Sequence, residues 1–195
     1  MANTLTDKRI GVALTGSFCT FDTALECIEI LIQEGAEVTA ILSAAAGTMD
    51  TKFGKAADFI EKLTTLTGRQ PITAIVDAEP IGPGKLLDAL IILPATGNTI
   101  AKLAVGIADS TATFAAKSHL RNGRPLILAI SSNDALAAGA KNIGQLLNTK
   151  NIYFVPFGQD NPVDKPRSIV FKKEYVLPAL LEALDGGQLQ PIIRG

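Results

Sequence analysis

Tryptophan is absent from this chain of 195 residues, which also has only one histidine and two cysteines. Cys19 and Cys27 are too few for a disulfide framework, and no cluster of histidines or cysteines stands near them to bind zinc. The sequence therefore predicts a fold without structural disulfides and without a metal site.

Long apolar runs and a strong charge are also missing. No stretch reaches the ~20 apolar residues of a membrane-spanning helix, and the polar start of the chain, residues 1–8, does not resemble a signal peptide. With 18 basic and 19 acidic residues, the net charge of −1 gives no electrostatic reason to bind nucleic acid or an anionic membrane. We expect a cytoplasmic protein that binds neither.

The sequence does have short apolar runs that alternate with helical patterns, and 47% of its residues are apolar, enough to fill a core. Strands are expected at residues 10–14, 38–42, 89–93, 126–130 and 152–155. Helices are expected at residues 21–32, 56–66, 98–107, 109–121, 134–147 and 174–184. This order predicts an α/β fold: a single domain over residues 1–195, with a three-layer, Rossmann-like, doubly wound and mainly parallel sheet.

Some boundaries depend on single residues. Asp109 and Asp134 are each placed to cap a helix that follows them. Residues 72–76 fit either an edge strand or an ordered loop. Residues 156–166 contain prolines and a glycine and are expected to form a loop after the last strand.

Loops at one edge of the predicted sheet are the candidate site, because ligands of such sheets bind beyond the carboxyl ends of the strands. Four of these loops, at residues 15–20, 43–48, 94–99 and 131–134, are rich in small hydroxyl or amide residues. In the first loop, Gly16 and Ser17 lie between a strand and a helix N-terminus. Free backbone N–H groups at such a position favour a phosphate.

The same loops have ordinary structural interpretations. Gly16 and Ser17 can form a simple turn, and Asn98 can cap the helix that follows the third loop. No further glycine follows Gly16 at the spacing of a dinucleotide fingerprint, and no Gly-Lys-Ser/Thr of a Walker loop occurs. The first loop therefore lacks both of these phosphate-binding signatures.

Three segments resemble a known family. The string PATGNTIAKLAVGIADS at residues 94–110 resembles the Pro-Ala-Ser-Ala-Asn-Thr segment of the homo-oligomeric flavin-containing Cys decarboxylases. The string IGVALTGS at residues 10–17 is similar to their N-terminal Gly-Ser loop, and residues 131–158 stand where they have a Pro-x-Met-Asn segment and its helix. The resemblance spans nearly the whole chain and implies a Rossmann-like domain that binds flavin mononucleotide (FMN).

The resemblance also implies which residues contact the flavin. Its phosphate is expected to face Gly16, Ser17 and Ser43. The rest of the flavin is expected to contact Phe18, Thr96, Gly97, Asn98, Thr99, Ser131, Ser132 and Asn133. Lys102, about one turn into its helix, is expected to face the ligand or a neighbouring subunit.

Two departures from the family pattern disfavour decarboxylation. The decarboxylases carry a catalytic histidine shortly before the Pro-Ala-Ser segment, but residues 77–87 hold none. The methionine of Pro-x-Met-Asn is also missing at residues 131–133. The chain is more similar to one branch, the B subunits that take part in forming dipicolinate, the calcium chelator of spores. That similarity includes ISSNDALAAGAKNI at residues 130–143 and NTKNIYFVPFGQDNP at residues 148–162.

The branch implies a role and partners for this chain. The implied reaction is oxidation of a dihydropyridine dicarboxylate to the aromatic dicarboxylate, with flavin as hydride acceptor and a companion A subunit that binds the nicotinamide. It further implies a homo-oligomer built on trimers, in the mother-cell cytoplasm of a sporulating bacterium. No catalytic residue is assigned. Two alternatives stay open: a flavin prenyltransferase or decarboxylase of the same fold, and a non-catalytic subunit that stabilises its partner.

Other reactive or charged residues have uncertain roles in the sequence alone. Cys19 is either a reactive thiol near a helix N-terminus or a small buried filler, and the filler interpretation is favoured. His119 is expected at the surface or as a capping residue, and Asp134 as a cap rather than a base. Basic residues that could recognise a dicarboxylate are Lys52, Arg69, Arg124, Lys165 and Arg167, although most are expected to be simply solvated.

Overall fold

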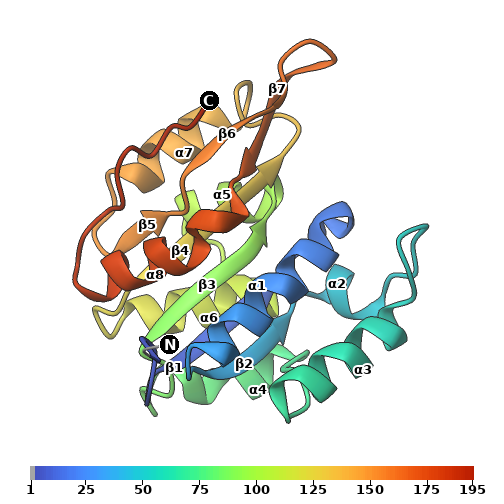
Figure 1. Cartoon of the computed structure of the whole chain (residues 1–195), viewed down its shortest axis with the longest axis vertical. Coiled ribbons are helices and arrows are strands. Elements are labelled where there is room, and N and C mark those ends of the chain that lie inside the picture. The colour runs from blue at the N-terminus through green and yellow to red at the C-terminus, as the bar shows by residue number, and fades with distance from the viewer. Residues whose placement is uncertain (1–2) are drawn as a thin grey trace.

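A computed structural model describes residues 3–195, in which a central sheet lies between two layers of helices (Figure 1). The described strands are β1 (Arg9–Leu14), β2 (Glu37–Leu42), β3 (Ala89–Ala95), β4 (Leu126–Ser132), β5 (Ile152–Phe154), β6 (Phe157–Asn161) and β7 (Lys165–Phe171). The α-helices are α1 (Phe21–Gln33), α2 (Ala44–Thr48), α3 (Ala56–Thr67), α4 (Ile75–Ala78), α5 (Gly97–Ala104), α6 (Thr111–Leu120), α7 (Ala140–Leu147) and α8 (Val176–Leu184). Short 3₁₀ helices span Phe18–Thr20, Glu79–Ile81 and Lys173–Tyr175.

The strands form a parallel sheet with an antiparallel hairpin at one end. Strands β2, β1, β3, β4 and β5 lie side by side and all pair in parallel. The hairpin of β6 and β7 joins the sheet where β7 pairs antiparallel with the end of β4, through Ser131 with Val170 and Ser132 with Ile169. The predicted α/β, doubly wound and mainly parallel sheet is therefore confirmed.

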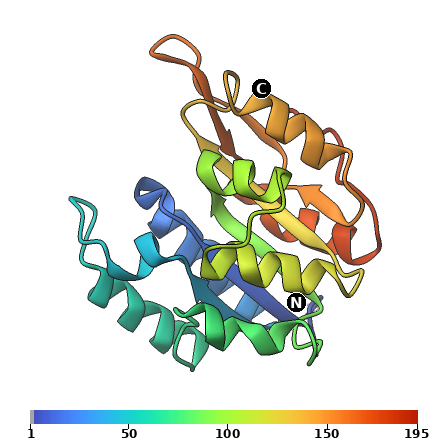
Figure 2. The same ribbon diagram turned by 180° about the vertical axis from the view of Figure 1, so that it is seen from behind.

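Helices cover both faces of this sheet. In Figure 1, α1 and α8 lie in front of the strands, and Figure 2 shows α4, α5 and α6 on the opposite face. One apolar core contains side chains of α1, α3 and α8, and the other contains side chains of α4, α5, α6 and α7. All seven residues of β3 are buried, as expected for a central parallel strand covered on both faces. None of the helices in the described part of the chain combines the length and the apolar character needed to cross a membrane.

The loop expected at residues 156–166 is wrong, because much of that segment belongs to the hairpin. Pro166 lies within β7, where its side chain is exposed and its missing N–H is tolerated beside the hairpin turn. The pairing of β7 with β4 links residues almost forty positions apart, so no local pattern indicated it. The short apolar run Ile169–Phe171 was the available signal for a strand.

Both predicted aspartate caps are also wrong. Ser110 caps α6 in a reciprocal capping box with Thr113, while Asp109 pairs with Lys102. Helix α7 begins only at Ala140, after turns, and the side chain of Asp134 accepts a hydrogen bond from Ser132 instead of capping it.

Residues 72–76, which fitted either an edge strand or an ordered loop, form a single strand bridge followed by the start of a helix. Ile72 makes one parallel bridge with Ile41, at the edge of the sheet beside β2, and α4 begins at Ile75. The predicted edge strand is therefore reduced to a single bridge before a helical turn.

His119 is fully buried, contrary to the expected surface position. It lies on α6, and its Nε2 is 3.0 Å from the carbonyl oxygen of Pro125, just before β4 begins. This contact requires the Nε2–H tautomer, and Nδ1 has no hydrogen-bond partner within residues 3–195. Burial lowers the pKa of His119 to about 4, although the hydrogen bond to Pro125 opposes that shift. The imidazole is therefore neutral at physiological pH.

This burial predicts a pH-dependent stability. Between pH 6.5 and about 4 the unfolded chain binds a proton at His119 and the folded chain does not, so stability falls as the pH is lowered through that window. The shift corresponds to about 3 kcal/mol of unfolding free energy. Replacing His119→Gln, which retains a donor for Pro125, should flatten the curve of unfolding free energy against pH, measured by urea denaturation. Parallel curves for the two proteins would contradict the assignment.

Candidate ligand site at the carboxyl edge of the sheet

The topology places a crevice between β1 and β3. Strand β1 pairs with β2 on one side and with β3 on the other, and the chain crosses over β1 on its way from β2 to β3. The connections that leave the carboxyl ends of β1 and β3 therefore diverge to opposite faces. Doubly wound folds bind their ligands at such a switch point.

A buried threonine joins the two sides of this crevice. Thr15, only 2% exposed, donates its hydroxyl hydrogen to the carbonyl oxygen of Pro94 at 2.6 Å and accepts the backbone N–H of Thr96 at 3.2 Å. Both hydrogen-bonding roles of the hydroxyl are thus used. The loop after β1 and the loop after β3 are consequently held in a fixed relation.

The loop after β3 is built by its two threonines. Thr96 caps α5 by accepting the backbone N–H of Thr99, and the two hydroxyl oxygens are 2.9 Å apart. Asn98, which could have been the cap, is exposed, and its side chain has no partner in the part of the chain that the structure describes. Asn98 is therefore free to bind a ligand, whereas Thr99 is buried and already bonded.

A pocket of about 330 Å³ unites the first loop, the loop after β4 and the hairpin. The hydroxyl oxygens of Ser17 and Ser131 share a hydrogen bond of 2.9 Å across it. At the end of β4, Ser132 donates to Asp134 at 2.6 Å. The structure thus brings Ser17 together with residues 131–133, and their contact with a ligand stays a prediction.

Gly97 sits where a side chain would not fit. A Cβ there would lie 2.6 Å from Oγ of Ser132 and 2.8 Å from the carboxylate of Asp134. The loops after β3 and β4 therefore approach each other closely only because Gly97 lacks a side chain. Gly16 is different, since the nearest atom to a Cβ there would be 3.5 Å away, on Ala45. Its small size would matter only to a ligand.

Eight of the twelve residues expected in the site do not line this pocket: Gly16, Thr96, Gly97, Asn98 and Thr99 beside it, and Phe18, Ser43 and Lys102, whose side chains have other contacts. The ring of Phe18 packs 5.1 Å from that of Phe21 and faces a separate pocket of about 110 Å³ beside α3. Ser43 caps α2 by accepting the N–H of Ala46. Lys102 pairs with Asp109 at 2.7 Å, and the hydrogen bond from Lys102 lowers the pKa of that carboxyl. Contacts from these residues to a ligand stay predictions.

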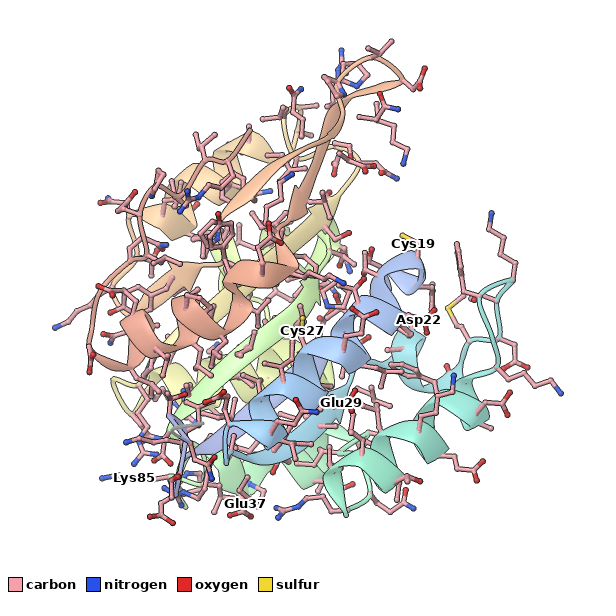
Figure 3. All side chains as sticks on the ribbon, viewed as in Figure 1. Cys19, Asp22, Cys27, Glu29, Glu37 and Lys85 are labelled. Carbon is pink, nitrogen blue, oxygen red and sulfur yellow. The ribbon has the colours of Figure 1, made fainter. Side chains whose placement is uncertain are left out.

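Cys19 corrects another expectation. The thiol is exposed rather than a buried filler, because the 3₁₀ turn Phe18–Thr20 carries it onto the surface between the two pockets, both of which it lines. Figure 3 shows Cys19 beside the start of α1, at the carboxyl edge of the sheet. The buried cysteine is Cys27, where burial raises the thiol pKa to about 11.

Sequence reasoning missed the contribution of the hairpin. Asp160, Lys165 and Ser168 line the pocket of Ser17 and Ser131, and Thr20 closes it from the first loop. Lys165 had been one of five basic candidates without a location. The hairpin that places it is defined by pairing with β4 and not by a local motif.

The strand order and the hydroxyl-lined crevice at its switch point are those of the doubly wound, nucleotide-binding class of α/β proteins. Comparison with known proteins gives the family: the model of the Flavoprotein family matches residues 2–170, and the chain belongs to this family.

Individual relatives are similar over almost the whole chain. The B subunit of dipicolinate synthase from Bacillus subtilis is 45% identical over 191 residues, which cover 98% of this chain and 96% of that protein. The crystal structure of the B subunit of dipicolinate synthase from Bacillus halodurans is 42% identical, with a TM-score of 0.91 over 100% of this chain and 99% of the other. Burkholderia xenovorans DmrB in complex with FMN is 21% identical, with a TM-score of 0.70 over 92% and 96% of the two chains, and shares the fold.

The close approach at Gly97 gives a test of the site's construction. Gly97→Ala should force Ser132 away from Asp134 and destabilise the protein by about 1–3 kcal/mol. Adding Ser132→Ala should recover part of that loss, because it removes the nearest atom. Gly144→Ala is the matched control: Gly144 lies on helix α7 with nothing within 4 Å of a Cβ, so alanine should stabilise by up to about 1 kcal/mol. Urea denaturation measures all three, and equal effects at residues 97 and 144 would refute the proposed contact.

Proposed function

We propose that this chain binds FMN at the carboxyl edge of its sheet and works with the A subunit of dipicolinate synthase. Together they would oxidise a dihydrodipicolinate-type precursor to dipicolinate during sporulation, in the mother-cell cytoplasm. The observation that carries the proposal is the 45% identity to the Bacillus subtilis B subunit over 98% of the chain. Membership of the Flavoprotein family and the FMN complex of DmrB, which has the same fold, support the choice of cofactor.

The residues at the crevice fit a flavin in two respects. Gly97 lets the loops after β3 and β4 pack against each other, so both lie at the same side of the crevice. The surrounding side chains are hydroxyls and amides, which can exchange their mutual hydrogen bonds for bonds to a polar ring. In the proposal, Gly16, Ser17 and Ser43 hold the phosphate. The ring and ribityl chain contact Phe18, Thr96, Gly97, Asn98, Thr99, Ser131, Ser132 and Asn133.

A bound flavin would supply the hydride acceptor, and the protein's part is to bind and orient. Proton removal needs a base, but the carboxylates near the pocket are already engaged, and the exposed thiol of Cys19 is the other candidate among the lining residues. Asp134 accepts from Ser132, and Asp160 pairs with Lys165 at 2.7 Å. His119 is buried beside Pro125, at the opposite end of β4 from Ser131. We therefore assign the missing catalytic groups to the A subunit.

The same observations weigh against the rival activities. A decarboxylase of the family type needs a histidine, and the chain's single histidine is neutral, buried and remote from the pocket. A prenyltransferase would need a basic cluster for a prenyl phosphate beside Ser17, where Phe18 and Cys19 stand instead. A purely stabilising role is the alternative that an assay must separate.

Self-assembly belongs to the proposal as well. Most residues of the apolar helix α6 are buried within the chain itself, so this helix offers little surface for an interface. Exposed apolar side chains available for assembly include Val105 and Ile107, after α5. We propose a homo-oligomer built on trimers, as the family resemblance implies.

Flavin binding can be measured directly. Titration of the purified chain with FMN should quench flavin fluorescence and saturate at micromolar concentration. Asn98→Leu should weaken binding by about 1–3 kcal/mol, because it removes a free amide that the ligand can use. Asn148→Leu, at an exposed asparagine after α7, is the control and should bind as the unaltered chain does. Absence of saturable binding would refute the flavin assignment.

The division of labour needs a second assay. This chain on its own should form no dipicolinate from the dihydropyridine precursor and should not decarboxylate cysteine-bearing substrates, since the carboxylates near its pocket are already bonded or paired. Adding a nicotinamide cofactor together with the A subunit should restore formation of the aromatic product, followed by its ultraviolet absorption. Turnover by this chain on its own would contradict the assignment of the catalytic groups to its partner. If the A subunit without this chain matched the pair, the stabilising role would be supported instead.

A further inference from the structure

The hairpin of β6 and β7 extends over the pocket and places charged side chains at its edge. Strand β7 pairs with β4 only through Ser131 and Ser132, so the part of β7 before Ser168 extends past the end of β4. Figure 1 shows the tip of β6 and β7 projecting beyond the carboxyl ends of the parallel strands. Side chains on this extension can therefore face a ligand that rests on the strand ends.

Among the five basic residues considered for dicarboxylate recognition, the structure singles out one. Arg69 pairs with Glu37 at the start of β2, and Arg124 pairs with Asp88 at the start of β3, so both are at the amino edge of the sheet. Lys52 lies 5.2 Å from the centre of the Phe53 ring, on the loop before α3. The remaining two are on β7, and only Lys165 lines the pocket, while Arg167 does not.

Lys165 is held by a partner that it can release. Its Nζ is 2.7 Å from Oδ2 of Asp160, and the two side chains are 55% and 37% exposed. Ion pairs this exposed contribute little to stability, so breaking the pair requires little free energy. The hydrogen bond and charge of Asp160 raise the pKa of Lys165, so the ammonium group stays charged at neutral pH. A carboxylate from a ligand can therefore take the place of Asp160.

The same pocket also offers neutral donors that are not among the residues assigned to the flavin. Thr20 and Ser168 line it with their hydroxyls. Ser168 donates to the amide oxygen of Asn133 at 3.4 Å, a long bond that the hydroxyl can exchange for one to an oxygen of the ligand. A ligand with two carboxylates can thus meet the cation with one and these hydroxyls with the other.

We infer that Lys165 is the carboxylate anchor for a planar pyridine dicarboxylate, with Asp160 occupying the ammonium group until the ligand displaces it. The ligand's second carboxylate rests on the hydroxyls of Thr20 and Ser168. The inference rests on the proposed function for the choice of a pyridine dicarboxylate, and it gives that site a specificity residue. Arg167 has the same charge on the same strand but does not take part.

The test is isothermal titration of the full chain with pyridine-2,6-dicarboxylate, with and without FMN. Lys165→Met should weaken binding about 10- to 100-fold, the range for losing one charge-assisted hydrogen bond. Lys165→Arg, which keeps the charge, should retain more binding than Lys165→Met. Arg167→Met is the matched control and should change binding less than about twofold, as expected for a solvated charge outside the pocket. Asp160→Asn should leave binding equal or tighter, because it removes the competing carboxylate.

Three other outcomes would refute the role of Lys165 as the carboxylate anchor. Equal loss of dicarboxylate affinity in Lys165→Met and Arg167→Met would show that only the overall charge matters. Weaker binding by Asp160→Asn would show that the ion pair is only structural. Lack of dicarboxylate binding by the unaltered chain at millimolar concentration would also refute it. Titrating the same proteins with FMN separates the two proposals. If dicarboxylate binding follows the expected order of variants while FMN does not bind, the assignment of Lys165 stands and the flavin site is refuted. If FMN binds but the dicarboxylate does not, the flavin site stands and the assignment of Lys165 is refuted.

Discussion

The two hydrogen bonds of the Thr15 hydroxyl fix the geometry on which the rest of the site depends. They join Thr15, after β1, to the carbonyl oxygen of Pro94 and the N–H of Thr96 on the β3 side of the switch point, and the Thr15 side chain has almost no access to water. Without this hydroxyl, both backbone groups would be left without this partner, each at a penalty of about 1–3 kcal/mol. Thr96, held in place, caps α5 and sets Gly97 against Ser132. The contacts between Ser131 and Ser17 then lead back to the first loop.

This network of hydrogen bonds explains how the loops around the site are held together. Most of its hydroxyls bond to one another, so the loops hold their shape without a ligand. Bonds between neutral hydroxyls are weak in net terms, and a ligand can replace them at small cost. The free side chain of Asn98 and backbone N–H groups then supply directional recognition. Such a site suits a cofactor whose polar atoms are spread over a large ring and whose charge is carried at one end.

Local sequence chemistry predicted the parallel part of the fold and most of the loops around the site. Strands such as β3 are continuous apolar runs, and their ends are marked by small polar residues, so both follow from short stretches of chain. Contacts outside the apolar pattern decided what was missed, over short stretches of chain for Asp109 and His119 and over a long one for β7. Ser110 and Asp109 are adjacent candidates for the same cap, and the contact of Asp109 with Lys102 decides between them. His119 is buried because its imidazole bonds to Pro125, and β7 exists because the end of β4 is available to pair.

The distribution of charge suggests how one fold serves different substrates. The parallel strands present hydroxyls, amides and backbone to the crevice, groups that recognise a cofactor through its shape and hydrogen bonds. The ionic pair that lines the pocket, Asp160 with Lys165, comes from the antiparallel hairpin, which is attached to the sheet only at the end of β4. Substitutions in such an extension change the charge above the pocket without disturbing the Thr15 contacts beneath it. In the proposed function, cofactor binding and substrate choice are therefore separable, because different secondary-structure elements, joined at Ser131 and Ser132, would carry them.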